Sequence, residues 1–416
     1  MVSTAQHLTD LATELTARGH DVTVLTGDRG YDDPAKRFPR REHWKNIRII
    51  RVPSLSLGKH SKWRRGIGFA SFLASCGFRL LTLPRFDVVV ALTSPPLISF
   101  LASLFVKLRG GRFCFWVMDL NPDEAIAAGW LRQEAALARL FQWMLRRSFM
   151  NADRTIVLDR FMKERLLAKG ANPETVAVVP PWSHDDAVTY SADGREAFRK
   201  QHGLIDKLVV MYSGNHSPCH PLDTLMKAAR ELKTRDDIIF CFVGGGSEQT
   251  KVRDFVARHG LDNVRCLPYQ PLDQLSGSLS AADVHVVVMG EAFVGIVHPC
   301  KVYNIMSVGA PILYIGPEVS HITDLANANY PLFFTRHGDT TRVVAQILEA
   351  RNCERQPLNA FSTHTLLPEL IDILEEPKSV DIGHLPFDIS HFSFSERNEA
   401  RKLELELPAV AQTNDK

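Results

Sequence analysis

The chain has 416 residues, more than a single hydrophobic core usually supports, so two domains are expected. Hydrophobic residues make up 45% of the chain and charged residues 23%, which is the range of globular proteins and leaves enough apolar side chains for two cores. Its 49 basic and 47 acidic residues give a net charge of +2, a balance that provides no strong field for nucleic acid and excludes it as a partner.

The seven cysteines are scattered singly, without a CxxC pair or a histidine at metal-ligand spacing. This pattern supports neither a metal site nor a disulfide framework, so we expect a reducing, cytoplasmic compartment. The first residues predict a polar helix, and we expect no signal peptide. Residues 88–106 are apolar enough to raise the alternative of a membrane span, but Thr93-Ser94-Pro95-Pro96 interrupts them, and a strand, a turn and a helix explain the same residues.

The first elements in chain order are a helix over residues 4–18 and a strand over 21–27, followed by a polar stretch to residue 44 that we interpret as a mobile loop. A strand over residues 47–53 comes next. Residues 59–65 are basic and contain Trp63, and an apolar helix follows them to residue 81. This pattern is typical of a segment that lies on an anionic membrane, and equally of a core helix with a solvated start.

Two buried strands, 86–92 and 112–120, flank a helix over residues 97–108. Asp119 lies at the end of the second strand. Its carboxylate has two interpretations, the cap of the helix that follows or a general base for an acceptor hydroxyl. Further helix and strand patterns lead to Pro180-Pro181-Trp182, which marks the end of a first domain.

The second half repeats the alternation of strands and helices, and glycine-rich turns follow its strands. Gly214 and Asn215 follow the first strand, Gly244–Gly246 and Glu248 the second, and Tyr269 the third. Because the carboxyl ends of parallel strands meet at one edge of a sheet, these turns are predicted to converge on a single site.

The most specific stretch is Val284–Gly316, which predicts a buried strand, a loop, a helix and a second strand. It places Gly295, His298 and Lys301 at the same sheet edge, where helix amino termini and a lysine favour an anion such as phosphate. A strand near residues 331–335, a helix over 338–350 and a closing helix follow. Residues 376–416 are polar and without a sustained period, which indicates a loosely ordered tail.

The segment Pro-Cys-Lys-Val-Tyr at 299–303, followed by Gly-Ala-Pro at 309–311, resembles the P-S-K-x-Y…G-x-P segment of the family 4 (group 1) glycosyltransferases, in the branch that builds bacterial surface polysaccharides. Residues 15–27 and 242–248 are similar to other segments of the same family. The resemblance implies the GT-B fold, an α/β architecture in which two Rossmann-like doubly wound parallel-sheet domains face across a cleft. The expected boundaries are 1–182, 183–358, a closing helix at 359–375 and the tail at 376–416. Relatives carry one strand and a glycine turn before the first helix, so the amino terminus is expected to be truncated and to leave an unpaired sheet edge.

The resemblance further implies that a sugar is transferred, with retention of configuration, from a nucleotide-diphosphate sugar to a lipid-linked or glycan acceptor. The expected nucleotide is UDP rather than GDP, and no cofactor or metal is expected. The reaction is expected on the inner face of the plasma membrane. The residues that it assigns to the donor are Gly214, Asn215, Gly245, Glu248, Tyr269, Gly295 and Lys301, and those that it assigns to catalysis are Asp119 and His298. Where many members have an arginine and a lysine, this chain has Asn215, His216 and His220. In place of the family's paired glutamates it has Val294 and, depending on the alignment, Val302 or Asn304. A nucleotide-sugar epimerase and a non-catalytic nucleotide-sugar-binding scaffold therefore stay open as alternatives.

Overall fold

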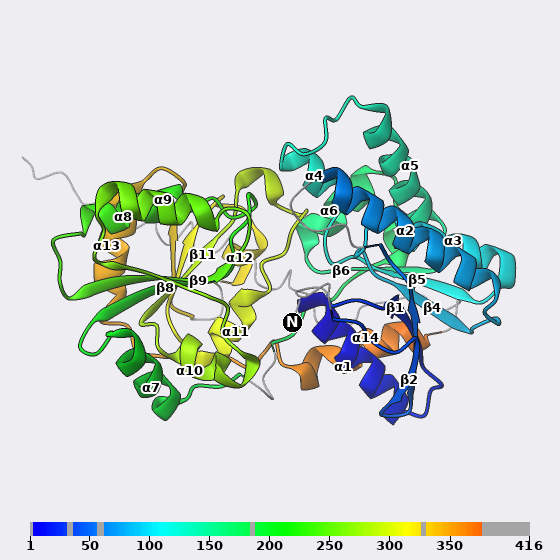
Figure 1. Cartoon of the computed structure of the whole chain (residues 1–416), viewed down its shortest axis with the longest axis horizontal. Helices are drawn as coiled ribbons and strands as arrows, with labels where there is room; N and C mark the ends of the chain where they lie inside the picture. Colours follow the sequence, from blue (N-terminus) through cyan, green and yellow to red (C-terminus); the bar gives the residue numbers. More distant parts are fainter. Residues whose placement is uncertain (1–2, 31–35, 56–61, 184–187, 326–329, 377–416) are drawn as a thin grey trace, which may run out of the picture. The chain divides into compact units, whose positions relative to one another are not determined.

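The computed structural model describes residues 3–30, 36–55, 62–183, 188–325 and 330–376 (Figure 1). In its amino-terminal half the strands are β1 (Thr23–Gly27), β2 (Arg41–Trp44), β3 (Ile47–Val52), β4 (Val88–Ala91), β5 (Arg112–Trp116), β6 (Arg154–Val157) and β7 (Val176–Val178). The helices of this half are α1 (Ser3–Ala17), α2 (Lys62–Leu81), α3 (Ile98–Arg109), α4 (Asp123–Ala127), α5 (Ala136–Met150) and α6 (Arg160–Ala168).

These strands form a parallel sheet of order β4-β5-β6-β7 and a smaller sheet of order β1-β3-β2. Strand β5 is buried on both faces. Phe113 and Phe115 pack in a cluster with side chains of α3 and α5, whereas Cys114 and Trp116 pack on the opposite face with Leu11 of α1. Alternation of side chains across the pleat explains why this strand is apolar throughout. Strands β1 and β4 each pair on one side only among the described residues.

The polar stretch before residue 47 is not entirely a loop, which corrects the prediction. Residues Arg41–Trp44 form β2, which pairs antiparallel with β3. The two strands are joined by Lys45 and Asn46, both with positive φ (48° and 63°), as a two-residue hairpin turn requires. The strand was missed because its side chains are mostly exposed and charged, so no apolar alternation reveals it.

The carboxyl-terminal half has strands β8 (Leu208–Asn215), β9 (Ile238–Gly245), β10 (Val264–Leu267), β11 (Val284–Val288), β12 (Ile312–Ile315) and β13 (Leu332–Thr335). Its helices are α7 (Ala192–His202), α8 (Asp223–Glu231), α9 (Gln249–His259), α10 (Leu275–Ser280), α11 (Lys301–Val308), α12 (His321–Asp324), α13 (Thr340–Ala350) and α14 (Thr363–Glu375). The strands make one parallel sheet of order β10-β9-β8-β11-β12-β13, so the predicted α/β class with parallel sheets is confirmed.

Helices cover both faces of this sheet (Figure 1). Side chains of α8, α9 and α13 share a core with Val210 and Phe240, whereas Phe198 of α7 packs on the opposite face with Val209 and Met211. From β8 the chain proceeds outward through β9 and β10, then returns to the other side of β8 with β11. The boundary between β8 and β11 is therefore the topological switch point, where doubly wound sheets bind ligands at the carboxyl ends of their strands.

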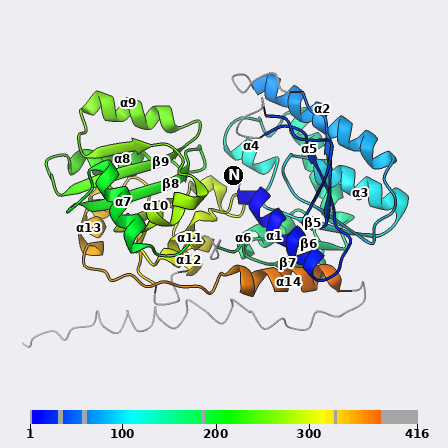
Figure 2. The same cartoon turned by 60° about the horizontal axis from the view of Figure 1, so that its bottom comes forward.

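Helix α14, although it is last in the chain, belongs to the core of the amino-terminal half (Figure 2). Leu370 and Ile371 are fully buried in the cluster that contains Trp116, and Arg18 at the end of α1 forms ion pairs with Asp372 and Glu375. Within the described ranges, no helix has both the length and the apolar character needed to cross a bilayer. The apolar residues 88–106 divide into β4 and α3, as the interrupting prolines predict.

Candidate active site

Two turns that contain three glycines approach each other at the carboxyl ends of β8 and β9. Gly214, Gly244 and Gly246 have φ values of +140°, +128° and +139°, which side chains other than glycine rarely adopt. A Cβ on Gly244 would stand 2.1 Å from the carbonyl oxygen of Gly214, and one on Gly246 would stand 2.2 Å from that of His216. The absence of side chains at these glycines thus allows the backbones of the turns after β8 and β9 to come into contact.

Lys301, the first residue of α11, reaches across to the β8 turn. Its Nζ lies 3.6 Å from the centre of the Tyr212 ring and 3.3 Å from where a Cβ on Gly214 would be. The nitrogen is buried, and no hydrogen-bond acceptor lies within reach of it among the described residues. Burial lowers the pKa of Lys301 to about 7. A shielded ammonium without an acceptor at the start of a helix is a site prepared for an anion.

Two histidines flank this lysine. His216 is fully buried, and neither of its ring nitrogens has a hydrogen-bond partner among the described residues. His220 is held by its Nδ1, 2.7 Å from the carbonyl oxygen of Val288. Burial lowers the pKa of both histidines, to about 3 for His220, and the nearby charge of Lys301 lowers each further. Both side chains are therefore neutral at pH 7, so the positive charge in this group is that of Lys301, which is about half protonated at this pH.

Tyr269 closes the other side of the turns. Its hydroxyl donates to the carbonyl oxygen of Gly245 at 3.0 Å, and its ring would lie 3.1 Å from a Cβ on that glycine. The side chain of Tyr269 is 59% exposed, so a planar group can reach the ring. Glu248 lies near the same turn and its amide donates to the carbonyl oxygen of His216, but its carboxylate forms an ion pair with Lys251.

A second group of polar residues lies where the amino-terminal half meets the loop after β11. Asp119 forms a bridge with Val297, and the amide of Leu120 donates to the carbonyl oxygen of Ile296 at 2.8 Å. Burial raises the pKa of Asp119 to about 7, and the neighbouring carboxylate of Glu124 raises it further. Glu124 also accepts a hydrogen bond from the thiol of Cys219 in the loop after β8, at 3.9 Å. A carboxyl that titrates near neutrality is suited to exchange a proton with a substrate hydroxyl.

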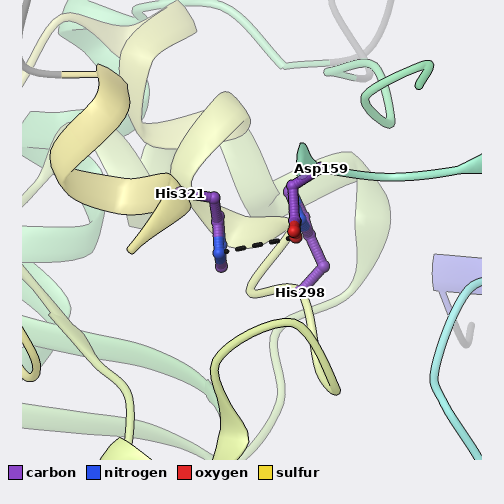
Figure 3. Close-up of side chains that lie close together, drawn as sticks. All are labelled: Asp159, His298 and His321. Atoms are coloured by element: carbon purple, nitrogen blue, oxygen red, sulfur yellow. Dashed lines mark hydrogen bonds and ion pairs between the residues drawn. The ribbon is translucent and has the colours of Figure 1, made fainter. Parts of the chain in front are cut away.

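A third group is the Asp159–His298–His321 cluster (Figure 3). All three of its side chains are buried. Asp159 Oδ2 lies 2.7 Å from His298 Nδ1 and 3.6 Å from His321 Nδ1, and the two imidazole rings stack with their centres 4.0 Å apart. The second ring nitrogen of His298 lies 2.7 Å from the hydroxyl of Tyr303. Both nitrogens of His298 are thus engaged within the protein, which leaves neither of them for a substrate in this geometry.

Sequence comparison identifies the family of both halves. Residues 4–182 match the family described as Glycosyl transferase 4-like domain, and residues 194–356 match Glycosyl transferases group 1. The chain is a group 1 glycosyltransferase. It is 28% identical over 311 residues to the putative colanic acid biosynthesis glycosyl transferase WcaI of Escherichia coli K12, which covers 71% of this chain and 75% of WcaI.

Another relative of the glycosyltransferase is the probable glycosyltransferase WbjE of Pseudomonas aeruginosa, 26% identical over 247 residues, or 58% of this chain and 60% of WbjE. Among solved structures, Anabaena HepE in complex with UDP-glucose superposes with a TM-score of 0.66 at 14% identity, covering 89% of this chain and 94% of HepE. That structural likeness supports the GT-B fold, and the predicted membership of the group 1 family is confirmed by the family matches.

The glycosyltransferase brings most of the predicted donor residues together and separates others. Gly214 contacts Lys301, Asn215 pairs with Gly245 across β8 and β9, and Tyr269 covers that pair. Gly295 instead packs against α6, because a Cβ on it would lie 2.6 Å from the carbonyl oxygen of Phe161. The carboxylate of Glu248 and the ring of His298 are both engaged with protein side chains.

The residues that sequence analysis missed share one property, which is that their partners are distant in sequence. They are Glu124, Asp159, Tyr212, Cys219 and His321. Asp159 resembles an ordinary helix cap, and it does accept from the amide of Met162 at 2.8 Å. Of these residues only Asp159 closely follows a strand, β6, so its position at a strand end is the one signal that could have indicated a role in the site.

Proposed function

We propose that this glycosyltransferase transfers a sugar, with retention of configuration, from a nucleotide-diphosphate sugar to a lipid-linked or glycan acceptor in surface polysaccharide synthesis. UDP is favoured over GDP as the nucleotide. The observation that carries the proposal is the buried ammonium of Lys301, which faces the Gly214 turn with no acceptor among the described residues. The UDP-glucose complex of HepE and the colanic acid role assigned to WcaI support the donor and the pathway class.

In the proposed reaction, the bond between the sugar and the diphosphate breaks while a bond to the acceptor oxygen forms. Lys301 and the amides of the Gly214 and Gly245 turns stabilise the negative charge that develops on the leaving diphosphate. Asp119 orients the acceptor hydroxyl or accepts its proton, and its raised pKa suits either task. The charge of the half-buried carboxylate of Glu124 adds to the rise in the pKa of Asp119.

Incubation of the full chain with labelled UDP sugars and GDP sugars in the presence of a bacterial lipid extract tests the proposal. We expect binding of UDP and transfer of label from at least one UDP sugar. Lys301→Met is expected to weaken UDP binding by roughly tenfold to a hundredfold, because a hydrogen bond to a charged group contributes about 1.5–3 kcal/mol. Absence of binding, protection and transfer with every UDP and GDP sugar would contradict the function.

We also propose that the amino-terminal half contacts an anionic membrane through three neighbouring helices, α2, α3 and α5. These helices contain no acidic residue, and α3 and α5 carry exposed basic ones, among them Lys107, Arg109 and Arg147. Large apolar side chains are exposed beside them; Phe78 is 74% and Leu108 76% exposed. Apolar side chains next to basic ones match the chemistry of an acidic lipid surface. Residues 59–61 of the predicted basic segment lie outside the described residues.

Co-sedimentation with lipid vesicles tests the membrane proposal. We expect the protein to bind vesicles that contain phosphatidylglycerol more strongly than vesicles of phosphatidylcholine alone. The double variant Phe78→Ser/Leu108→Ser should bind less. Val319→Ser, which removes an exposed apolar side chain from the carboxyl-terminal half, is the matched control and should bind normally. Equal binding by the double variant and the native protein would contradict the proposal.

A further inference from the structure

The Asp159–His298–His321 cluster joins the two halves of the chain immediately before the donor lysine. Asp159 is the amino-terminal cap of α6, whereas His298 lies in the loop that leads into α11 and His321 begins α12. All three side chains are buried, and Figure 3 shows the carboxylate beside the stacked rings. The reaction proposed above assigns no role to this cluster.

The spacing of the cluster raises the possibility of a metal ion, since its ligand atoms lie within 4.8 Å of one another. The ring geometry argues against it. A metal bound by two imidazoles lies close to the planes of both rings, but these rings are stacked at 4.0 Å with an interplanar angle of 20°, so their planes run nearly parallel. Asp159 Oδ2 also stands at hydrogen-bond distance from His298 Nδ1. The cluster is therefore arranged to hold a proton.

The protonation pattern follows from the hydrogen bonds. The pKa of Asp159 is held at about 2 because His298 donates to it and both histidines lie near it, which outweighs its burial, so it is a carboxylate at neutral pH. Burial lowers the pKa of His321 to about 3 and leaves it neutral. Burial raises the pKa of Tyr303 well above 10, so a neutral hydroxyl lies beside His298 Nε2. Because the Asp159 carboxylate can only accept, His298 Nδ1–H donates to it.

His298 in turn holds the first turn of α11. Its carbonyl oxygen accepts from the amide of Cys300 at 2.8 Å and from the thiol of the same residue at 3.3 Å. Its ring is bound to Tyr303 on the helix itself. Lys301 lies in sequence between Cys300 and Tyr303, so the position of His298 fixes the position of the Lys301 backbone.

We propose that Asp159 is a positioning residue for the donor site: through His298, it fixes the start of α11 and thereby places the Lys301 ammonium against the Gly214 turn. The inference rests on the proposed binding of a nucleotide diphosphate at Lys301. Asp159 itself touches no substrate. In metal sites, replacing a residue that orients a ligand in this way changes affinity or activity by about 10–100-fold, and we expect an effect of the same order here.

Isothermal titration with UDP and with GDP measures the effect in the full chain. We expect Asp159→Asn to bind the nucleotide at least roughly tenfold more weakly than the native protein. Arg160→Met is the matched control, because Arg160 comes from the same helix and also contacts the other half, through Asp324 at 2.7 Å, but does not touch His298. This variant should bind within about twofold of the native protein.

A pair of substitutions at His298 separates positioning from a general loss of structure. The side-chain amide of Asn places an N–H donor near the position of His298 Nδ1, whereas Phe keeps an aromatic ring but has no hydrogen-bond donor. We expect His298→Asn to restore a substantial part of the affinity that His298→Phe loses, and this pair decides the question if Asp159→Asn fails to fold. Thermal midpoints measured alongside show whether the variants are folded.

Four results are informative against the inference. Native affinity in a folded Asp159→Asn protein overturns it, and so does an equal loss in Arg160→Met, which would indicate a general effect of contact between the halves. Stabilisation of the native protein by Zn²⁺ that is lost in His321→Asn would overturn it in favour of a metal site. If the native protein binds neither UDP nor GDP, the proposed function fails first, and the inference fails with it.

Discussion

At the scale of single residues, the proposed donor site depends on one charge that has no counter-ion among the described residues. The ammonium of Lys301 is shielded from water by Tyr212 and the Gly214 turn, and the histidines near it are neutral. A diphosphate at this position gains a charge-assisted contact in a region of low dielectric, where such contacts are strong. The pKa of Lys301 is lowered because its charge is buried without an anion beside it in the free protein.

This imbalance predicts that nucleotide binding takes up a proton. The pKa of Lys301 is about 7 in the free protein, and a bound diphosphate raises it, so the complex holds more protons than the free protein above pH 7. UDP affinity should accordingly fall by up to about tenfold per unit as the pH rises from 7 to 9. Titration calorimetry in buffers of different ionisation enthalpy measures the uptake.

Lys301→Met supplies the control for this prediction. Its UDP affinity should be weak and should not change between pH 7 and 9, and its binding should take up no proton. If the variant shows the same pH dependence as the native protein, another group titrates and the assignment to Lys301 is wrong.

Asp119 predicts a different pH effect, on the rate of transfer rather than on binding. With a pKa near 7, Asp119 is protonated at pH 6 and cannot accept a proton, so the rate at saturating donor should rise between pH 6 and 8 and then level off. Asp119→Asn should lower the rate by about 10²–10⁴-fold and remove this rise, with UDP affinity unchanged. Transfer of labelled sugar to a lipid extract measures the rate. A native profile that is flat over this range would contradict the role.

The sequence predicted some of these residues and not others for a physical reason. Gly214 and Lys301 follow adjacent strands at the switch point of a parallel sheet, so their meeting follows from chain order and sheet topology. Asp159 and His298 are 139 positions apart, and they lie in loops that follow strands of two different sheets. No periodic pattern in the sequence predicts their contact. Each of these two residues alone fits an ordinary structural role.

At the scale of elements, the loop from Glu291 to Cys300 connects the two groups of polar residues. Val297 in this loop is bridged to Asp119, and Arg165 of α6 donates to the carbonyl oxygen of Val294 at 2.6 Å. Lys301 follows directly. The carboxylate of Asp119 and the ammonium of Lys301, to which we assign the acceptor and the donor, are thus attached to one short segment, and its backbone controls their separation.

Substitution of Gly295 tests how closely this loop packs against α6. A Cβ there would lie 2.6 Å from the Phe161 carbonyl oxygen, and its φ is +67°. Gly203, with φ of +66° and open space around it, is the matched control. Chemical denaturation should show a loss of about 1–2 kcal/mol for Gly203→Ala, from the left-handed backbone alone, and about 2–5 kcal/mol for Gly295→Ala, where steric overlap adds to it. Equal losses would show that the loop moves away from α6 without strain.

Prediction of elements from the sequence succeeded where the strands are buried on both faces. The core strands β8, β9 and β11 are continuous apolar runs, and each was placed within a few residues of its observed bounds. Strand β2 was not found, because an exposed edge strand such as Arg41–Trp44 needs no apolar side chains. Its hairpin partner β3 was found from its buried isoleucines.

At the scale of the whole molecule, helices α6 and α14 tie the two halves of the chain together. Helix α14 carries the end of the described chain back into the core around Trp116, and α6 holds the loop before Lys301. All six tryptophans lie between residues 44 and 182, in the amino-terminal half. Tryptophan fluorescence therefore reports the unfolding of that half alone.

This distribution allows the coupling between the halves to be measured. UDP is expected to bind mainly to residues of the carboxyl-terminal half, yet the contacts of α6 and α14 should transmit the stabilisation to the half that contains the tryptophans. At 100 times its dissociation constant, UDP should add about 2.7 kcal/mol to the free energy of unfolding. We expect the midpoint detected by tryptophan fluorescence to rise together with that detected by far-UV circular dichroism. If UDP shifts the circular dichroism signal while the tryptophan transition stays in place, the halves unfold independently, and the contacts of α6 and α14 do not couple them.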